Sequence, residues 1–309
     1  MTVERALEAV PSRRGPGPTQ GPRLAPYLFI SPFYLLFLTF VALPLVHSIW
    51  FSLHDTIGLK SRVFVGLDNY VSLAQDPLFH RGLWNSVYFS LGTLFLQLPL
   101  ALALAIALNS PRLRLKTFFR FAFFSPVLVA GVFIAIIFSL VFNHEYGLLN
   151  HILASFGIPT AGLRWLQDDR LVMPAIILTG VWRWTGFNMV YFLAGLQSIR
   201  QELYEAAAID GAGSWQQFLH VTLPGLRPML VFVLVMSLMG SLQLFDLPYI
   251  LLTGAGPNNS GLTAVMYLYQ QGFQFGRLGY AAAIGWTLFA IVFVISMLQI
   301  RFLGKPVED

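Results

Sequence analysis

Long apolar runs separated by short polar segments dominate the chain. A helix needs about 20 predominantly apolar residues to cross a membrane. Six stretches have this character, and they run approximately over residues 25–53, 84–108, 117–142, 172–197, 228–253 and 278–303. Several contain proline, which membrane helices tolerate because neighbouring helices satisfy the freed carbonyls. The pattern predicts an all-α, polytopic membrane protein with about six transmembrane helices, several of them kinked and all bundled together.

Composition supports lipid as the solvent for much of the surface. Of the 309 residues, 56% are apolar and 11% are charged, whereas a soluble domain carries about 25% charged residues. Residues 1–24 are rich in proline, glycine and arginine and predict a disordered cytoplasmic tail ahead of a transmembrane domain over 25–305. The apolar run behind the tail is too long for a signal-peptide core and lacks a small-residue cleavage site, so we expect it to stay attached.

The basic residues flank the apolar runs instead of forming a stripe, which favours a membrane protein over a nucleic-acid-binding one. With the N-terminus inside, the cytoplasmic segments hold Arg5, Arg13, Arg14, Arg23, Arg112, Arg114, Lys116, Arg120, Arg200, Arg227, Arg301 and Lys305. The opposite side holds Lys60, Arg62, Arg81, Arg164, Arg170 and Arg277. Because Lys and Arg accumulate on the cytoplasmic side of membrane proteins, the distribution predicts a multi-pass protein with both termini in the cytoplasm.

Three outer loops follow from this topology, at about residues 54–83, 143–171 and 254–277. They carry short aromatic, glycine and polar signatures: FVGLDNY (64–70), YGLLN (146–150) and GAGP (254–257). Ordinary turn chemistry, with aromatic residues at the membrane interface, accounts for such strings.

The segment between the fourth and fifth spans, residues 198–227, is too polar to span and yet is not linker-like. Ser198 with Gln201 and Ser214 with Gln217 have the spacing of capping boxes, and each begins a short helical pattern. Gly211 suits the end of the first helix, and we expect the second helix to stop before Pro224. The pattern predicts two short helices joined by a Gly-Ala-Gly elbow. A helix lying on the membrane surface is an alternative, but the acidic tip favours a protein partner over anionic lipid.

This segment carries the signature of a known family. Glu205-Ala206-Ala207, then Gly211, then Val221 and Leu223-Pro224 resembles the EAA motif of permeases of ABC importers, with Val221 where isoleucine is more frequent. The strings ELYEAAAIDGA, WRWTGFNMVYFLAGLQSI and QLFDLPYILLTGAGP resemble the sugar-importing branch, the maltose and glycerol-3-phosphate type. The resemblance covers nearly the whole chain after about residue 25.

The resemblance implies a fold, partners and a place in the cell. It implies that the segment is a cytoplasmic coupling helix that docks on an ATPase through Glu205, Ala206, Ala207, Asp210 and Gly211. It also implies a bacterial or archaeal plasma membrane location, a second permease subunit, two copies of the cytoplasmic ATPase, an extracytoplasmic solute-binding protein and a carbohydrate-like substrate. The chain has no G-x-x-x-x-G-K-[ST] phosphate loop, so we expect ATP and Mg to be bound by the partner ATPase and no cofactor by this chain.

Ionisable and polar residues inside the spans are candidates for the solute pathway. Arg183 and Asp246 lie at comparable depths in two antiparallel spans, where they form a direct pair or each face a watered cavity. Sugar sites combine aromatic faces with groups that pair with hydroxyls. The candidates for the substrate pathway are therefore Trp184, Asn188, Tyr191, Ser237, Gln243 and Asp246. Helix–helix hydrogen bonding and interfacial aromatic residues are the alternative for each.

Other functional classes lack support. The six histidines are scattered, and neither an H-E-x-x-H motif nor a carboxylate pair within a span is present, so we predict no catalytic or metal site and no enzyme. Without cysteine, the chain offers no thiolate metal site or disulfide. A secondary transporter of a polar solute is the principal alternative, but it is expected to show internal repeats, and none is evident. A membrane scaffold without transport is the third possibility.

Overall fold

The computed structural model describes residues 24–57 and 61–303, so the predicted tail lies, apart from Leu24, outside the described residues. The chain divides into two compact units, Met1–Ser48 and Ile49–Asp309. In the first unit, α1 (Ala25–Phe37) continues into the π-helical turn η1 (Leu38–Ala42) and then into α2 (Leu43–Ser52), which crosses the unit boundary. Within this stretch, Pro26–Ser52 is long and apolar enough to cross a membrane, and it coincides with the first predicted span.

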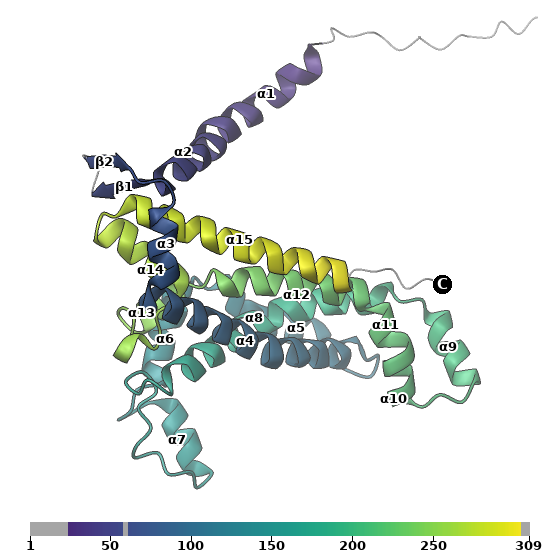
Figure 1. The fold of residues 1–309 in the computed structure, drawn as a ribbon. Helices are drawn as coiled ribbons and strands as arrows, with labels where there is room; N and C mark the ends of the chain where they lie inside the picture. Colours follow the sequence, from purple (N-terminus) through teal and green to yellow (C-terminus); the bar gives the residue numbers. More distant parts are fainter. Residues whose placement is uncertain (1–23, 58–60, 304–309) are drawn as a thin grey trace, which may run out of the picture. The chain divides into compact units, whose positions relative to one another are not determined.

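The second unit is almost entirely helical (Figure 1). Its elements are β1 (His54–Ile57), β2 (Ser61–Phe64), α3 (Asp68–Gln75), α4 (Pro77–Asn109), α5 (Lys116–Leu128), α6 (Gly131–Val141), α7 (Leu148–Ser155), α8 (Val172–Ser198), α9 (Gln201–Ile209), α10 (Ser214–Gln217), η2 (Phe218–Thr222), α11 (Leu223–Gly225), α12 (Arg227–Leu242), α13 (Asp246–Leu251), η3 (Pro257–Asn259), α14 (Ala264–Tyr269), η4 (Gln270–Gln274) and α15 (Leu278–Leu303). β1 and β2 form an antiparallel hairpin. The hairpin, α3, α13 and α14 lie at one end of this unit, and α9 and α10 lie at the other (Figure 1).

Two of the predicted spans are not single helices. The third, predicted over 117–142, is divided at Val129 and Ala130 into α5 and α6, which meet at an angle of 99°. The fifth, predicted over 228–253, is divided at residues 243–245 into α12 and α13. The first break is apolar, so the hydrophobic pattern alone does not reveal it, whereas the polar Gln243 and the charged Asp246 border the second. In each case the second piece, α6 or α13, packs against the other.

The helices α4, α8 and α15 correspond to the second, fourth and sixth predicted spans. Within the described residues, α4, α15 and the N-terminal helix are each long and apolar enough to cross a membrane, and up to five spans result if each of two bent helix pairs is one span. α8 has the length, with 27 residues, but is not among them. It carries Arg183, Thr185 and Asn188 and is largely enclosed by α4, α5 and α12, so it needs less apolar surface.

Glycine permits the closest helix contact in the bundle. A Cβ atom at Gly186 of α8 would lie 1.7 Å from the carbonyl oxygen of Phe123 in α5, so no larger residue fits without separating the helices. A Cβ atom at Gly180, six residues earlier, would lie 3.0 Å from the ring of Phe89 in α4. α8 is therefore clamped between α4 and α5 by backbone proximity.

Asp76 connects three elements at the hairpin end. Its carboxylate accepts hydrogen bonds from the backbone N–H groups of Leu78 and Phe79, which caps α4 and explains why this helix begins seven residues before the predicted span. The same carboxylate accepts hydrogen bonds from the hydroxyls of Tyr267 in α14 and, at 2.6 Å, Tyr280 in α15. Burial raises the pKa of Asp76, but these hydrogen bonds outweigh it, and the pKa lies below its ordinary value. Burial and the neighbouring carboxylate raise the pKa of Tyr267, so its hydroxyl stays protonated.

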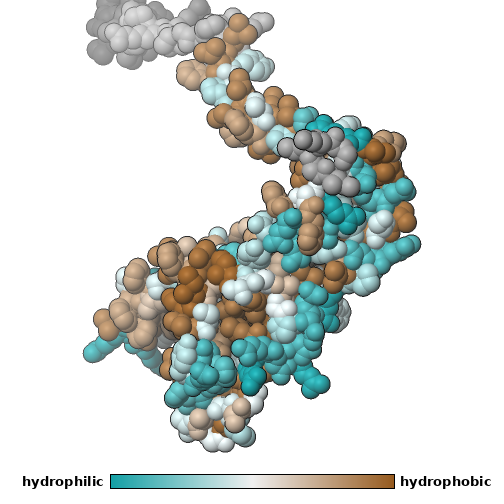
Figure 2. Space-filling view, turned by 90° about the vertical axis from the view of Figure 1, so that its left-hand side faces the viewer, coloured by the Kyte–Doolittle hydropathy of each residue, from teal (hydrophilic) through white to brown (hydrophobic). Residues whose placement is uncertain are grey.

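Buried amides explain two of the loop signatures. Asn69 of the first signature donates to the carbonyl oxygens of Ser52 and His54 at 2.9 and 3.0 Å, which fixes α3 to the hairpin. Figure 2 views this end of the second unit and shows hydrophilic and hydrophobic residues interspersed on it.

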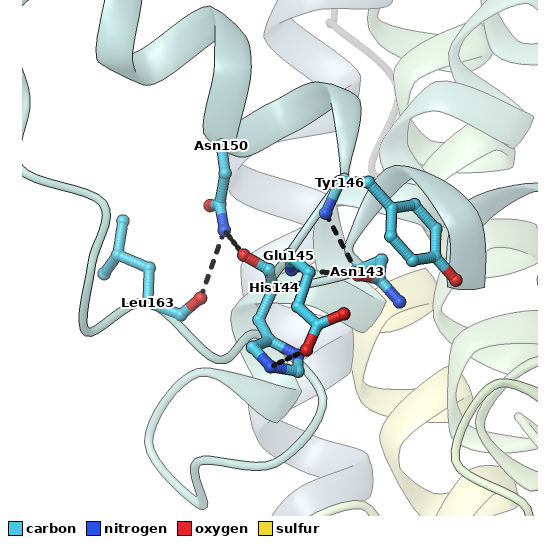
Figure 3. A network of polar contacts seen from close by, with 6 residues as sticks. All are labelled: Asn143, His144, Glu145, Tyr146, Asn150 and Leu163. Carbon is cyan, nitrogen blue, oxygen red and sulfur yellow. Dashed lines mark hydrogen bonds and ion pairs between the residues drawn. The ribbon is translucent and has the colours of Figure 1, made fainter.

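Asn150 organises the loop between α6 and α8 (Figure 3). Its amide donates to the carbonyl oxygens of His144 and Leu163, each at 3.3 Å, and its side-chain oxygen accepts from the indole of Trp165 at 2.8 Å. Asn143 closes the preceding turn by accepting from the backbone N–H groups of Glu145 and Tyr146 (Figure 3). Turn chemistry therefore accounts for only part of the second signature: Tyr146 belongs to this turn, whereas Leu148 to Asn150 begin α7, with Asn150 buried.

Candidate functional site

A cavity of about 350 Å³ lies among α4, α8, α12 and the break before α13. Its walls are formed by Phe89, Thr93, Gln97, Gly180, Arg183, Trp184, Phe187, Asn188, Tyr191, Phe232, Val233, Met236, Ser237, Gly240, Gln243, Leu244, Asp246 and Leu247. All six residues predicted for the substrate pathway line this one cavity. That they contact a solute stays a prediction.

Helical spacing on α8 produces one wall. Arg183, Trp184, Phe187, Asn188 and Tyr191 recur at intervals of three and four residues, so they face the same side. The aromatic members form a continuous series, because the ring of Phe187 contacts both Trp184 and Tyr191, with centroids 5.7 and 5.0 Å away. This series continues onto α12, where the ring of Phe232 lies 5.3 Å from Tyr191.

Two polar contacts join this wall to the opposite one. The amide of Asn188 donates to the hydroxyl of Ser237 on α12 at 3.1 Å. The guanidinium Nη1 of Arg183 lies 3.4 Å from Oδ2 of Asp246, the first residue of α13. The direct pair that the sequence left open is therefore formed. The pair is unequal in burial, with 14% of the Arg183 side chain exposed and 49% of that of Asp246.

Arg183 also lies close to an aromatic ring and to a glycine. Its guanidinium carbon lies 5.0 Å from the centre of the Trp184 ring, a cation–π geometry, while its buried Nε has no hydrogen-bond partner. A Cβ atom at Gly131, where α6 begins, would lie 2.1 Å from the carboxylate of Asp246 and 2.8 Å from Arg183. The ion pair therefore occupies the space that a side chain at Gly131 would fill.

The α4 side of the cavity was missing from the sequence prediction. Phe89, Thr93 and Gln97 lie on one face of α4, again four residues apart. Gln97 is 6% exposed in the structure. A single amide within an apolar run was the available signal, but which helix faces α8 depends on tertiary packing.

The predicted coupling residues lie at the opposite end of the unit, on α9 and the turn that follows it (Figure 1). α9 has no buried residue, and Glu205, Ala206, Asp210 and Gly211 are exposed while Ala207 is partly so. Gly211 has φ +79°. Around it the N–H groups of Gly211 and Ala212 donate to the carbonyl oxygens of Ala208 and Ala207, which is a Schellman ending.

The helix starts in this segment differ from the predicted capping boxes. The hydroxyl of Ser198 donates to the carbonyl oxygen of Gly195 because α8 continues to this residue, and α9 begins without a side-chain cap. At α10 it is Gln216, instead of Gln217, whose side chain accepts the N–H of Gly213, at 2.9 Å. Pro224 does not end the second helix, since it lies in the first turn of α11.

The exposed face of this segment combines acidic and apolar residues. Ile209 is 86% exposed and Trp215, which stacks on Phe218, is 69% exposed. A hydrogen bond of 2.9 Å between the hydroxyls of Tyr204 and Thr222 ties α9 to η2. The segment is thus internally braced while its outward surface is available to a partner. Among the described residues, no group of three His, Asp or Glu side chains could hold a metal ion.

The geometry defines a bundle of helices, several of them long and apolar enough to cross a membrane, with an internal cavity and an exposed helical segment at one end. Residues 97–305 match the family described as binding-protein-dependent transport system inner membrane component. The chain belongs to this family, and it is a permease subunit of an ABC importer. A secondary transporter is thereby excluded.

Relatives extend the similarity along the chain. It is 41% identical to the arabinooligosaccharides transport system permease protein of Bacillus subtilis, over 92% of this chain and 90% of that one. It is 38% identical to the lactose transport system permease protein of Rhizobium radiobacter, over 88% and 92%. It is 34% identical to the sulfoquinovosyl glycerol transport system permease protein of Agrobacterium fabrum, over 97% and 98%.

A solved structure shares the fold. It is the crystal structure of a bacterial alginate ABC transporter in complex with an alginate pentasaccharide-bound periplasmic protein. The match has a TM-score of 0.76 and 24% identity, over 89% of this chain and 92% of that one.

Proposed function

We infer that the cavity is the passage for a carbohydrate. The observation that carries this proposal is the combination of the aromatic series Trp184, Phe187 and Tyr191 with the amides of Gln97 and Asn188 around one space. Aromatic rings cover the C–H faces of sugar rings, while amides donate to and accept from neighbouring hydroxyls. Relatives whose names specify arabinooligosaccharides and lactose support the same class of solute.

The charge of the cavity favours a neutral sugar. Arg183 and Asp246 are the charged residues among those that line it, and they pair with each other. An anionic solute would have to compete with Asp246 for the guanidinium, at a cost in affinity.

The other components of the transporter follow from family membership and from the exposed 198–227 segment. The 198–227 segment docks on a cytoplasmic ATPase, two copies of which bind ATP and Mg and drive the cycle. A second permease subunit completes the pathway, and an extracytoplasmic solute-binding protein delivers the sugar at the end that carries the hairpin. Both termini lie in the cytoplasm of a bacterial or archaeal cell, and the chain itself performs no catalysis. The excess of Lys and Arg in the segments at the α9 end supports this orientation.

Uptake of labelled sugars by cells that contain the whole transporter tests the substrate class. Arabinotriose, lactose and trehalose are suitable probes, and Asn188→Ala should lower kcat/KM for the transported probe about five- to tenfold, because a cavity hydrogen-bonding group is lost. Val190→Ala, on the exposed side of the same helix, is the matched control and should transport normally. Absence of uptake of every probe would refute the carbohydrate assignment.

A pull-down from membranes in mild detergent tests the docking segment. The wild-type chain should retain an ATPase subunit, and Glu205→Lys should lose it because a carboxylate facing the partner is reversed in charge. Glu145→Lys changes an exposed carboxylate in the loop between α6 and α8 and should retain the ATPase. Equal recovery with both variants would contradict the proposed docking role.

A further inference from the structure

A second, open pocket of about 530 Å³ lies between the end of α13 and the π-helical turn η4. It is lined by Tyr249, Ile250, Thr253, Gly254, Gln270 and Gln274, of which none is charged. Figure 1 places these elements at the hairpin end of the unit, away from α9. No part of the transport cycle described above uses this pocket.

Four aromatic rings form a cluster beside it, and one of them, Tyr249, lines the pocket. Phe245, Tyr249 and Tyr269 contact one another, with centroids 5.1 to 5.5 Å apart, and Tyr269 stacks on Phe273 at 5.4 Å. Phe273 is 73% exposed. An exposed aromatic ring leaves apolar surface in contact with water. A ligand with a flat C–H face would cover that surface.

The cluster lies near the cavity in the chain. Phe245 is placed between Leu244 and Asp246, and both of these line the cavity. Phe245 and Tyr249 also pack against the buried cluster that contains Met266, so the rings are held in place from below.

Polar groups accompany the rings. The side-chain amides of Gln270 and Gln274 and the hydroxyl of Thr253 border the pocket, and the amide of Gln274 donates to the hydroxyl of Tyr249 at 3.4 Å. Amide and hydroxyl groups next to ring faces match a ligand with hydroxyls around an apolar ring face.

The backbone beside the pocket adopts disfavoured conformations. Thr253 has φ +51°, in the left-handed region that a β-branched residue rarely occupies, although glycine would fit there without strain. η4 is a π-helical turn, as are η1 and η2, and such turns are frequent at functional sites. The N–H groups of Thr253 and Gly254 donate to the carbonyl oxygens of Ile250 and Tyr249, so this conformation ends α13 and fixes the position of Thr253 beside the pocket.

We propose that Phe245, Tyr249, Tyr269 and Phe273, with Gln270, Gln274 and Thr253, form an outer platform that binds a neutral sugar ring before the sugar reaches the cavity. The proposal rests on the carbohydrate assignment of the cavity. The platform holds the sugar through ring stacking and hydroxyl pairing, so it adds to loading and not to the later movement across the membrane.

Transport kinetics of the complete transporter, with the probe that wild type imports, test the platform. Tyr249→Ala and Gln270→Ala should each raise KM about three- to tenfold and leave the maximal rate unchanged, since they remove binding that precedes the conformational step. Tyr249→Phe keeps the ring and should stay within about twofold of wild type. Phe275→Ala, an exposed aromatic residue just after η4, is the matched control and should match wild type.

Saturation-transfer NMR on the intact complex in nanodiscs, with the same probe, gives a second measurement. Signal from the sugar should fall in the Tyr249→Ala complex and persist in the Phe275→Ala complex. Unchanged KM and unchanged NMR signal in both platform variants, while Asn188→Ala still impairs uptake, would overturn the platform alone. Loss of the second permease subunit from Tyr249→Ala and Gln270→Ala pull-downs would also overturn it, by showing a subunit contact. Failure of wild type to import any sugar would instead refute the carbohydrate assignment itself.

Discussion

Arg183, in the middle of α8, and Asp246, at the start of α13, form an ion pair at the edge of the cavity. Two different kinds of element position them. The guanidinium comes from the continuous helix α8, and the carboxylate comes from α13, a short helix that begins inside the bundle. Because each carries a charge in a mostly apolar setting, removing one partner leaves the other uncompensated. The pair therefore links the break in the fifth span to the fixed axis of α8.

Gly131 is the residue whose substitution tests this pair without removing a charge. Gly131→Ala should displace Asp246, because the added Cβ overlaps its carboxylate. We expect uptake to fall at least about tenfold while the protein still inserts and binds its ATPase. Gly285→Ala, where the nearest atom to the new Cβ is 3.4 Å away, is the control and should keep its activity. Normal uptake by Gly131→Ala would mean that the pair is not required.

Gly186→Ala should destabilise the fold itself. Its Cβ would collide with a backbone carbonyl of α5, which has no rotamer by which to move away. Overpacking of this kind costs about 1–3 kcal/mol or more, so we expect a clear fall in the thermal unfolding temperature in detergent. In Gly240→Ala the new Cβ has no heavy atom within 4 Å, and its unfolding temperature should fall much less.

The lowered pKa of Asp76 predicts a pH dependence of stability. A carboxyl group whose pKa is lower in the folded state contributes stability above its unfolded pKa of about 3.9, and this stability is lost as the pH falls through the folded pKa. Wild type should therefore lose more unfolding free energy than Asp76→Asn between about pH 5 and pH 3. Fluorescence-monitored unfolding across this range measures the difference. Parallel pH profiles for the two proteins would contradict the role of the carboxylate.

Gly211→Ala should impair coupling through local strain. A residue with a Cβ atom in the left-handed region costs about 1–2 kcal/mol more than glycine, so the turn after α9 should shift. We expect uptake and stimulated ATP hydrolysis to decrease, while the thermal stability of the bundle stays close to that of wild type. Gly213→Ala, at φ −68°, needs no such conformation and should retain both activities.

The sequence predicts single helices better than it predicts where they break or meet. The 278–303 span coincides with α15, because a continuous apolar segment in lipid satisfies its backbone hydrogen bonds by forming a helix. The break at Val129 escapes the pattern because its residues are apolar, and the polar Gln243 and Asp246 at the second break fall within an otherwise apolar run. The packing of α6 against α13 that follows these breaks depends on tertiary structure.

The residues that line the cavity could likewise be predicted only in part. Trp184, Asn188 and Tyr191 share a face by helical periodicity, so one wall could be predicted from spacing alone. Thr93 and Gln97 could not, because only the tertiary packing of α4 on α8 brings them to the same space. Gly211 was predictable as a helix end from its residue type, whereas the role of Ser198 was not, because α8 continues through it.

The uninterrupted length of α8 has a mechanical consequence. Asn188 lies ten residues before Ser198, or about 15 Å along the axis, and α9 starts three residues after Ser198. Gly186 lies against α5, and α8 has no break between Asn188 and Ser198. A displacement at the Ser198 end of α8 would therefore be transmitted along the helix to the aromatic wall. The facing wall, α12, ends instead at the break before Asp246, where the chain can bend. Because one wall of the cavity is rigid and the facing wall is interrupted, a single displacement would change the width of the passage.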